Sequence, residues 1–186
     1  MNACCQKLFR RVKNRDGFTL IEMLIVIIIL GILAMAIIPQ ISVSTDDAKV
    51  STLKSNLSAV RSAIETYYAQ HNQTYPGVAG DGTNAAGTAL AFINQLTQFS
   101  TAAGVVSGTK TATAIYGPYI KGGIMPSNPF ITDPAKSNLV TVAATADVTT
   151  ARSVLAGGNG WAYWYNIGIF YANEDGSSGG VLHYNY

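Results

Sequence analysis

Two successive stretches with different hydrophobic patterns make up residues 18–70. From Phe18 to Ile38 the residues are almost all apolar, a run long enough for a helix to cross a hydrocarbon core about 30 Å thick. After Pro39 the apolar residues recur at spacings of three and four, which indicates a helix with one buried side. The recurring positions are Leu53, Leu57, Val60, Ile64 and Tyr67. We predict one helix from Phe18 to about Gln70, with a transmembrane first part (18–39) and an amphipathic second part (40–72).

Two features interrupt the apolar stretch. Gly31 and Pro39 weaken a helix, because glycine gains no side-chain packing and proline removes a backbone hydrogen bond, so a kink is expected there. Glu22 places a carboxylate one turn inside the stretch, at a cost on the order of 2–3 kcal/mol in a bilayer. Its position near the interface explains how it is tolerated, but not why it is there.

The remaining residues, 73–186, predict a small globular head. A loop region (77–113), rich in glycine, alanine, threonine and serine, contains a helical pattern at about 87–99. A connector (114–131) with three prolines and three glycines comes next. Alternating and aromatic segments at 138–143, 161–166, 169–173 and 181–186 predict strands of an antiparallel sheet within 138–186. The fold class is therefore α+β, a long helix packed on a small sheet in a lollipop arrangement.

Charge is distributed unevenly along the 186 residues. The net charge is only +2, but residues 1–17 carry five basic side chains (Lys7, Arg10, Arg11, Lys13 and Arg15) against Asp16 alone. Positive residues that precede a first apolar span mark its cytoplasmic side, so we read this pattern as topology and not as a nucleic-acid site. The head is expected outside the cytoplasm. Both cysteines, Cys4 and Cys5, fall in this leader, so the head has no disulfide.

The sequence Gly17-Phe18-Thr19-Leu20-Ile21-Glu22, followed by the apolar run to Pro39, resembles the processing site of type IV pilins and of type II secretion pseudopilins. The connector 114–131 also resembles the segment before the sheet in major pseudopilins. The resemblance implies that a prepilin peptidase cuts between Gly17 and Phe18, removes residues 1–17, and leaves a Phe18 amine that is then N-methylated.

The same resemblance implies a structural subunit rather than an enzyme. Subunits would polymerise with copies of themselves through residues 18–39, driven by an assembly platform in the inner membrane. Glu22 of an incoming subunit would attract the Phe18 amine of the subunit already in place, and the helix would loosen between Gly31 and Pro39. The product would be a surface pilus, used for adhesion, motility or DNA uptake, or a periplasmic pseudopilus of a type II secretion system.

Three other interpretations remain open from the residues alone. Ala34-Met35-Ala36 fits the cleavage pattern of a secretory signal peptide, although the apolar run is long for one. The run also suits an uncleaved membrane anchor. An anchored, monomeric periplasmic binding module would use the aromatic sheet as its surface, for a carbohydrate for example, and it predicts no cleavage after Gly17 and tolerance of Glu22→Leu.

Catalytic and metal-binding signals are sparse. No nucleophile, phosphate-loop or dinucleotide motif occurs, and His71 and His183 are expected to be structural. Major pseudopilins hold calcium in a C-terminal loop, and Glu174, Asp175 and Asp133 are the comparable acids here. They do not match the family pattern residue by residue, so we expect no cofactor.

Overall fold

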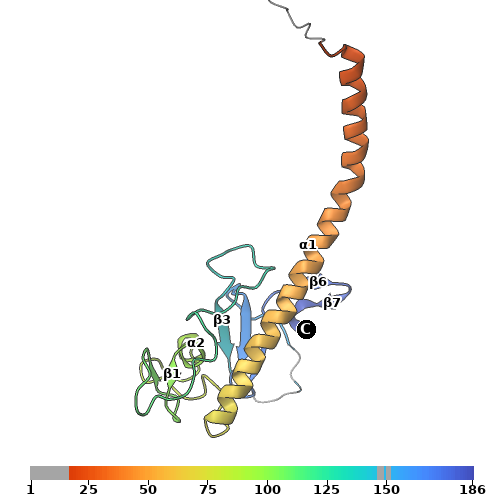
Figure 1. The fold of residues 1–186 in the computed structure, drawn as a ribbon. Coiled ribbons are helices and arrows are strands. Elements are labelled where there is room, and N and C mark those ends of the chain that lie inside the picture. Colours follow the sequence, from red (N-terminus) through yellow and green to blue (C-terminus); the bar gives the residue numbers. More distant parts are fainter. Residues whose placement is uncertain (1–16, 146–148, 150–151) are drawn as a thin grey trace, which may run out of the picture. The chain divides into compact units, whose positions relative to one another are not determined.

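The computed structural model describes residues 17–145, 149 and 152–186, without the side chains of residues 36–44. The predicted leader, with both cysteines, lies outside the described residues except for Gly17. The chain divides into two compact units, Met1–Val43 and Ser44–Tyr186. Helix α1, Leu20–Gln70, contributes to both, so the predicted helix from Phe18 to about Gln70 is confirmed (Figure 1).

The helix assignment is continuous through Gly31 and Pro39, and the predicted kink and loosening there stay predictions. The sequence also predicts that the first part of this helix spans a membrane. None of the helices in the described part of the chain combines the length and the apolarity that crossing a membrane requires.

The core of the second unit forms on the predicted apolar side of α1. Burial of these side chains against the sheet is the main source of stability, since apolar area removed from water contributes roughly 25 cal/mol per Å². The large α1 side chains of this core, each at most 2% exposed, are Leu53, Leu57, Val60, Ile64 and Tyr67. They pack with Phe92 of helix α2, Ala89–Thr97, and with Trp161, Tyr163 and Phe170 of the sheet. The amphipathic pattern therefore predicted the core correctly.

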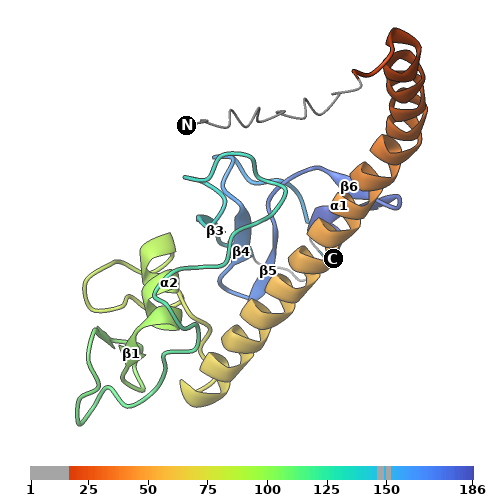
Figure 2. The same ribbon diagram turned by 45° about the horizontal axis from the view of Figure 1, so that its top comes forward.

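The strands form three small sheets. Strands β1 (Phe99–Ser100) and β2 (Val106–Ser107) make a short antiparallel pair after α2. The central sheet has the order β3 (Val140–Ala143), β4 (Trp161–Trp164) and β5 (Ile169–Ala172), and Figures 1 and 2 show it against the second part of α1. Strands β6 (Ser177–Ser178) and β7 (Val181–Leu182) pair with each other, before a short 3-10 helix, His183–Asn185.

The prediction of a wholly antiparallel sheet was wrong. Strands β4 and β5 form the expected antiparallel hairpin, but β3 pairs with β4 in parallel, with Val140 opposite Trp161. A parallel pair needs a crossover of about a dozen residues or more, and the segment 144–160 between β3 and β4 is long enough to supply it. The sheet is therefore mixed.

The predicted last strand, 181–186, was also wrong in its extent and partner. Gly179 and Gly180 have φ of 59° and 80°, the left-handed pair that a tight two-residue hairpin requires. The turn folds Val181 back onto Ser178. As a result β7 ends at Leu182 and stays outside the central sheet, and the His183 side chain is buried.

Candidate assembly site

The predicted cleavage site precedes α1. Gly17, Phe18 and Thr19 are non-helical and exposed, and the Phe18 side chain is 78% exposed. A Cβ added at Gly17 would meet no atom within 4 Å. The Gly17–Phe18 peptide therefore lies in an exposed, non-helical segment, the kind of substrate that a peptidase can reach.

Thr19 and Glu22 close the start of α1 in a reciprocal cap. The Thr19 amide and hydroxyl both donate to Glu22 Oε2, each at 2.8 Å, and the Glu22 amide donates to Thr19 Oγ1 at 3.3 Å. This is the Ser/Thr-x-x-Glu capping box, which satisfies amides that the helix itself leaves free. Thr19 was not predicted as part of the site, although its spacing of three residues from Glu22 is the signal of a capping box.

The structure does not place Glu22 against Phe18 in the same chain. Both donors to the carboxylate come from Thr19 and both use Oε2, so Oε1 accepts no hydrogen bond from the residues that the structure describes. One oxygen is thus held by the cap while the other stays available to a donor from outside. The predicted pairing with a neighbour's Phe18 amine stays a prediction.

The helix after the cap exposes apolar side chains on every side. The large apolar residues between Phe18 and Met35 are each 44–86% exposed. Soluble monomers seldom expose a continuous apolar surface of this kind, which marks a surface that contacts another protein or a lipid phase. The sequence alone predicted this property of the segment.

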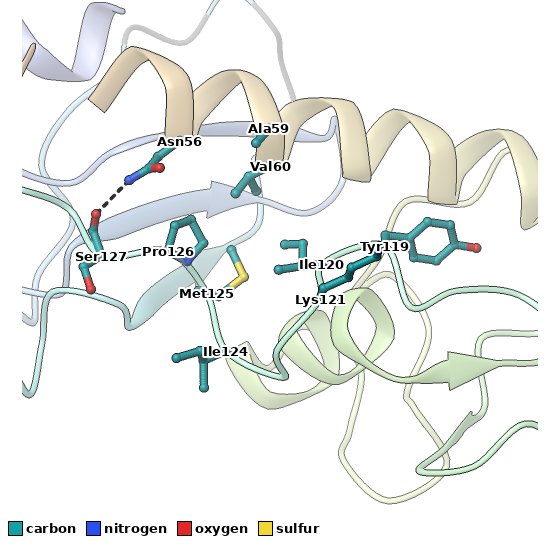
Figure 3. Close-up of a pocket in the computed structure, with 10 residues that line it drawn as sticks. All are labelled: Asn56, Ala59, Val60, Tyr119, Ile120, Lys121, Ile124, Met125, Pro126 and Ser127. Atoms are coloured by element: carbon teal, nitrogen blue, oxygen red, sulfur yellow. Dashed lines mark hydrogen bonds between the residues drawn. The ribbon is translucent and has the colours of Figure 1, made fainter. Parts of the chain in front are cut away.

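Two grooves flank α1 in the second unit. The first, which we call the apolar groove, has a volume of about 480 Å³ and lies between α1 and the connector (Figure 3). Asn56 bridges its two walls by donating to the Ser127 carbonyl at 3.0 Å. Tyr119 of the connector donates to Gln70 at 2.7 Å and contacts the Tyr67 ring edge-on. Tyr119 therefore packs the connector on the second part of α1.

The second groove, which we call the cationic groove, has a volume of about 330 Å³ and is lined by Lys54, Leu57, Ser58, Arg61 and Tyr186. Arg61 donates from Nε to the Phe170 carbonyl at 2.9 Å and from Nη2 to the Tyr186 carbonyl at 2.6 Å. Glu65 lies four residues after Arg61, a spacing that allows an ion pair on a helix. No ion pair joins these two side chains in the described structure, because Arg61 bends toward the sheet instead.

The two histidines are buried and hydrogen-bonded. His71 contacts the Tyr67 carbonyl at 2.9 Å and Ser100 Oγ at 3.0 Å, and its ring stacks on Tyr67. His183 contacts Glu174 through Nδ1 and Ser178 Oγ through Nε2, the latter at 2.8 Å, beneath the Phe130 ring. Such satisfied, ring-packed histidines hold a fold together.

The acids considered for calcium do not converge. Glu174 binds His183 and the Gly176 amide, while Asp133 accepts from the Ala135 amide in another loop. In the described part of the chain, no three His, Cys, Asp or Glu side chains lie close enough together to hold a metal ion.

Comparison with known proteins bears on the N-terminal third. The family described as "Prokaryotic N-terminal methylation motif" matches residues 12–38. Residues 12–38 therefore carry a prokaryotic N-terminal methylation motif, which confirms the resemblance that the sequence suggested for the start of this stretch, Gly17 and Phe18 included.

Two kinds of relative match part of this chain. The "Type II secretion system core protein G" of Pseudomonas aeruginosa is 41% identical over 64 residues, 34% of this chain and 44% of that protein. Its counterpart in Vibrio cholerae is 30% identical over 67 residues, 36% of this chain and 45% of that protein. A "Fimbrial protein" of Pseudomonas aeruginosa is 44% identical over 54 residues, 29% of this chain and 35% of that protein.

This chain thus matches less than half the length of these relatives. No solved structure is a significant match to its fold. The family match covers the methylation motif and the start of the helix that follows it, residues 12–38.

Proposed function

We propose that this protein is a structural subunit of a type IV pilus or pilus-like filament, cut by a prepilin peptidase between Gly17 and Phe18 and assembled through the start of α1. The observation that carries the proposal is the methylation motif of residues 12–38, which runs directly into a helix with exposed apolar side chains on every side. Packing copies of this helix against one another removes that surface from water.

In the proposed filament, Glu22 and Phe18 set the axial register between neighbouring subunits. Cleavage creates an ammonium group on Phe18, and the Thr19 cap leaves Glu22 Oε1 free to accept it from a neighbouring subunit. A charge pair is much stronger among apolar helices than in water, because the effective dielectric constant is low there. The pair therefore fixes the axial stagger, while apolar burial supplies most of the association energy.

Before assembly, the subunit would reside in the inner membrane with residues 1–17 in the cytoplasm and the head on the other side. The basic residues before the apolar run support this orientation. An inner-membrane platform would then move subunits into a filament made of copies of this chain. Loosening of the helix between Gly31 and Pro39 would accompany that step.

Two kinds of filament are consistent with the proposed function. The fimbrial relative supports an extended surface pilus, and the core protein G relatives support a short periplasmic pseudopilus of a type II secretion system. The resemblance of connector 114–131 to major pseudopilins favours the second within the family. A monomeric, membrane-anchored binding module is the competing class.

The first experiment shears intact cells and determines the intact mass and the N-terminal sequence of this protein in each fraction. Abundant sheared protein that begins at methylated Phe18 supports a surface pilus. Protein that begins at Phe18 but stays with the membranes supports a pseudopilus. A start at Met1, or directly after Ala36, contradicts the proposal and supports an anchor or a signal peptide.

A second experiment separates the charge of Glu22 from its role in the cap. Glutamine at this position still completes a capping box, so Glu22→Gln keeps the helix start and removes only the charge. Both Glu22→Gln and Glu22→Leu should be cleaved after Gly17 yet fail to assemble. Normal assembly of Glu22→Gln would show that the carboxylate acts through the cap alone, and tolerance of both variants would favour the monomeric module.

A further inference from the structure

Three cationic side chains lie in or near the cationic groove. Lys54 Nζ lies 4.4 Å from the centroid of the Tyr186 ring, and Arg61 is partly buried beside it. Arg152 is near enough to act electrostatically on Arg61 and donates to the Tyr184 carbonyl at 3.3 Å. Of the ion pairs within the described residues, one joins Lys49 to Asp46 and the other His183 to Glu174. None of the three cations Lys54, Arg61 and Arg152 therefore forms an ion pair with a side-chain carboxylate of the described residues.

The surroundings of Arg61 disfavour its charged form. Partial burial removes water from the Arg61 guanidinium, and the neighbouring Arg152 repels it, so both effects lower the Arg61 pKa from its ordinary value. The main-chain oxygens of Phe170 and Tyr186 satisfy some of its donors. Lys54 is exposed beside Arg61, so its ammonium group can reach an anionic partner on another molecule.

The same flank of α1 carries an unpaired acid. Asp47, Lys54 and Arg61 are spaced by seven residues, so each lies on nearly the same side of the helix as the last, with a drift of about 20° per step. Successive members of this series are about 10.5 Å apart along the axis. Asp47 is exposed and forms no ion pair with any described residue. We call Asp47, Lys54 and Arg61 the charged stripe.

We propose that the charged stripe is a contact between copies of this chain, in which Asp47 of one subunit binds Lys54 at the mouth of the cationic groove of the next. Parallel helices offset by seven residues, one step of the charged stripe, bring Asp47 next to Lys54. Helices without an offset would instead place Lys54 next to Lys54 and Asp47 next to Asp47. Because the acid and the cations occupy different positions, the contact is head to tail. Repetition of such a contact builds an open filament rather than a closed dimer.

This inference rests on the proposed filament function and adds a second register signal to it. When Phe18 of one subunit pairs with Glu22 of the next, the two helices are offset along their axes by four residues. When Asp47 of one subunit pairs with Lys54 of the next, the offset has the same direction and measures seven residues. The difference is about 4.5 Å along a helix, which the flexible four-carbon stem of lysine can span. Both ends of the contact lie in the Ser44–Tyr186 unit.

Charge reversal in the full chain tests the contact. Lys54→Glu and Asp47→Lys should each be cleaved at Gly17 as in the wild type, yet reduce filament yield about five- to tenfold, because each places like charges together. The double variant Asp47→Lys with Lys54→Glu should restore most of the yield. Lys121→Glu, on the exposed connector beside the apolar groove, is the matched control and should assemble normally.

A cysteine pair gives a direct readout in either kind of filament. Positions 47 and 54 are too far apart within one helix for an intrachain disulfide, so Asp47→Cys with Lys54→Cys can only cross-link different subunits. Mild oxidation of cells should yield a ladder of covalent multimers from this variant and none from Asp47→Cys with Lys121→Cys.

The outcomes separate this inference from the proposed function. If the wild type forms no filament and is not cut at Gly17, the proposed function fails. If it assembles and both charge reversals leave the yield unchanged, only the contact is wrong. A third outcome is that Lys54→Glu lowers the filament yield, Asp47→Lys does not, and the double variant shows no rescue. That result would mean that the groove binds some other anion, such as a lipid headgroup, and it would also overturn the contact.

Discussion

At the scale of single residues, the core contains one hydroxyl without a hydrogen-bond partner. Tyr163 is fully buried on β4 against Phe92, and its Oη is the only buried side-chain polar atom without a partner in the described structure. Burial raises the pKa of this phenol far above its ordinary value, so the group stays neutral. An unsatisfied buried polar group costs roughly 1–3 kcal/mol.

Tyr163→Phe should therefore raise the free energy of unfolding, by about 1 kcal/mol. Tyr171→Phe is the matched control, because Tyr171 on β5 is also buried but donates to the Ser153 carbonyl at 3.0 Å. That variant should lower stability by about 1 kcal/mol. Urea unfolding of the full chain in detergent measures both. Equal destabilisation by the two changes would show that the Tyr163 hydroxyl has a partner in solution.

A second residue-scale prediction concerns pH. Burial against Tyr67 lowers the His71 pKa from its ordinary value of about 6.5, although the hydrogen bond to the Tyr67 carbonyl partly opposes this shift. The folded state thus prefers neutral His71. Its contribution to stability is complete above about pH 6.5 and is lost as the pH falls through the lower folded-state pKa.

Unfolding midpoints near pH 7.5 and near pH 5.5 bracket the upper part of this window. We expect a fall in stability for the wild type and a smaller fall for His71→Gln, which cannot be protonated. An identical pH dependence in both proteins would assign the acid sensitivity to other groups.

At the scale of elements, the turn between β4 and β5 depends on a glycine. Gly168 has a φ of 72°, and a Cβ added there would overlap the ring of Tyr75. That ring is fixed by stacking on Tyr68, with centroids 4.3 Å apart. Gly180, with a φ of 80°, has the same backbone strain but open space around it.

Gly180→Ala should therefore cost about 1–2 kcal/mol from backbone strain alone. Gly168→Ala should cost about 1–3 kcal/mol more, because the Tyr75 ring must also move. Thermal or urea unfolding of the two variants gives this difference. If the two substitutions are equally destabilising, the contact between the turn and Tyr75 contributes nothing to the fold.

Sequence patterns predicted those elements that are set by local periodicity. The apolar repeat from Leu53 to Tyr67 predicted the buried side of α1, and the aromatic runs around Trp161 and Ile169 predicted the β4–β5 hairpin. The parallel pairing of β3 was missed because pairing direction depends on where a long connection returns, which periodicity does not encode. The short extent of β7 was set by the Gly179-Gly180 turn, whose pairing partner the strand pattern did not specify.

The residues of the candidate site likewise fall into those that the sequence predicted and those that only the fold reveals. Gly17, Phe18 and Glu22 were found from a contiguous motif, while Thr19 was missed although the capping spacing was present. Helix spacing allows Arg61 to pair with Glu65, but Arg61 binds main-chain oxygens of Phe170 and Tyr186, more than a hundred positions away in sequence. Only the tertiary fold brings those groups together, so the cationic groove could not be read from the chain.

At the scale of the whole molecule, the position of the unit boundary decides which fragment is a folding unit. The Ser44–Tyr186 unit contains its own core, and the second part of α1 supplies one entire side of it. The Met1–Val43 unit contributes none of these core residues, and its described side chains are exposed. The head should therefore fold without the first unit, but not without the second part of α1.

Residues 44–186 expressed alone should be soluble, monomeric and cooperatively folded, whereas the full chain should require detergent because of its exposed apolar helix. Residues 73–186 should fail to fold, since removing Leu53, Leu57, Val60, Ile64 and Tyr67 exposes the apolar side of the sheet, and each such side chain contributes about 1.5–3 kcal/mol by burial. Circular dichroism with urea titration and gel filtration distinguishes the fragments. A cooperatively folded 73–186 would show that α1 only lies on the head, and an unfolded 44–186 would show that the head depends on the first unit.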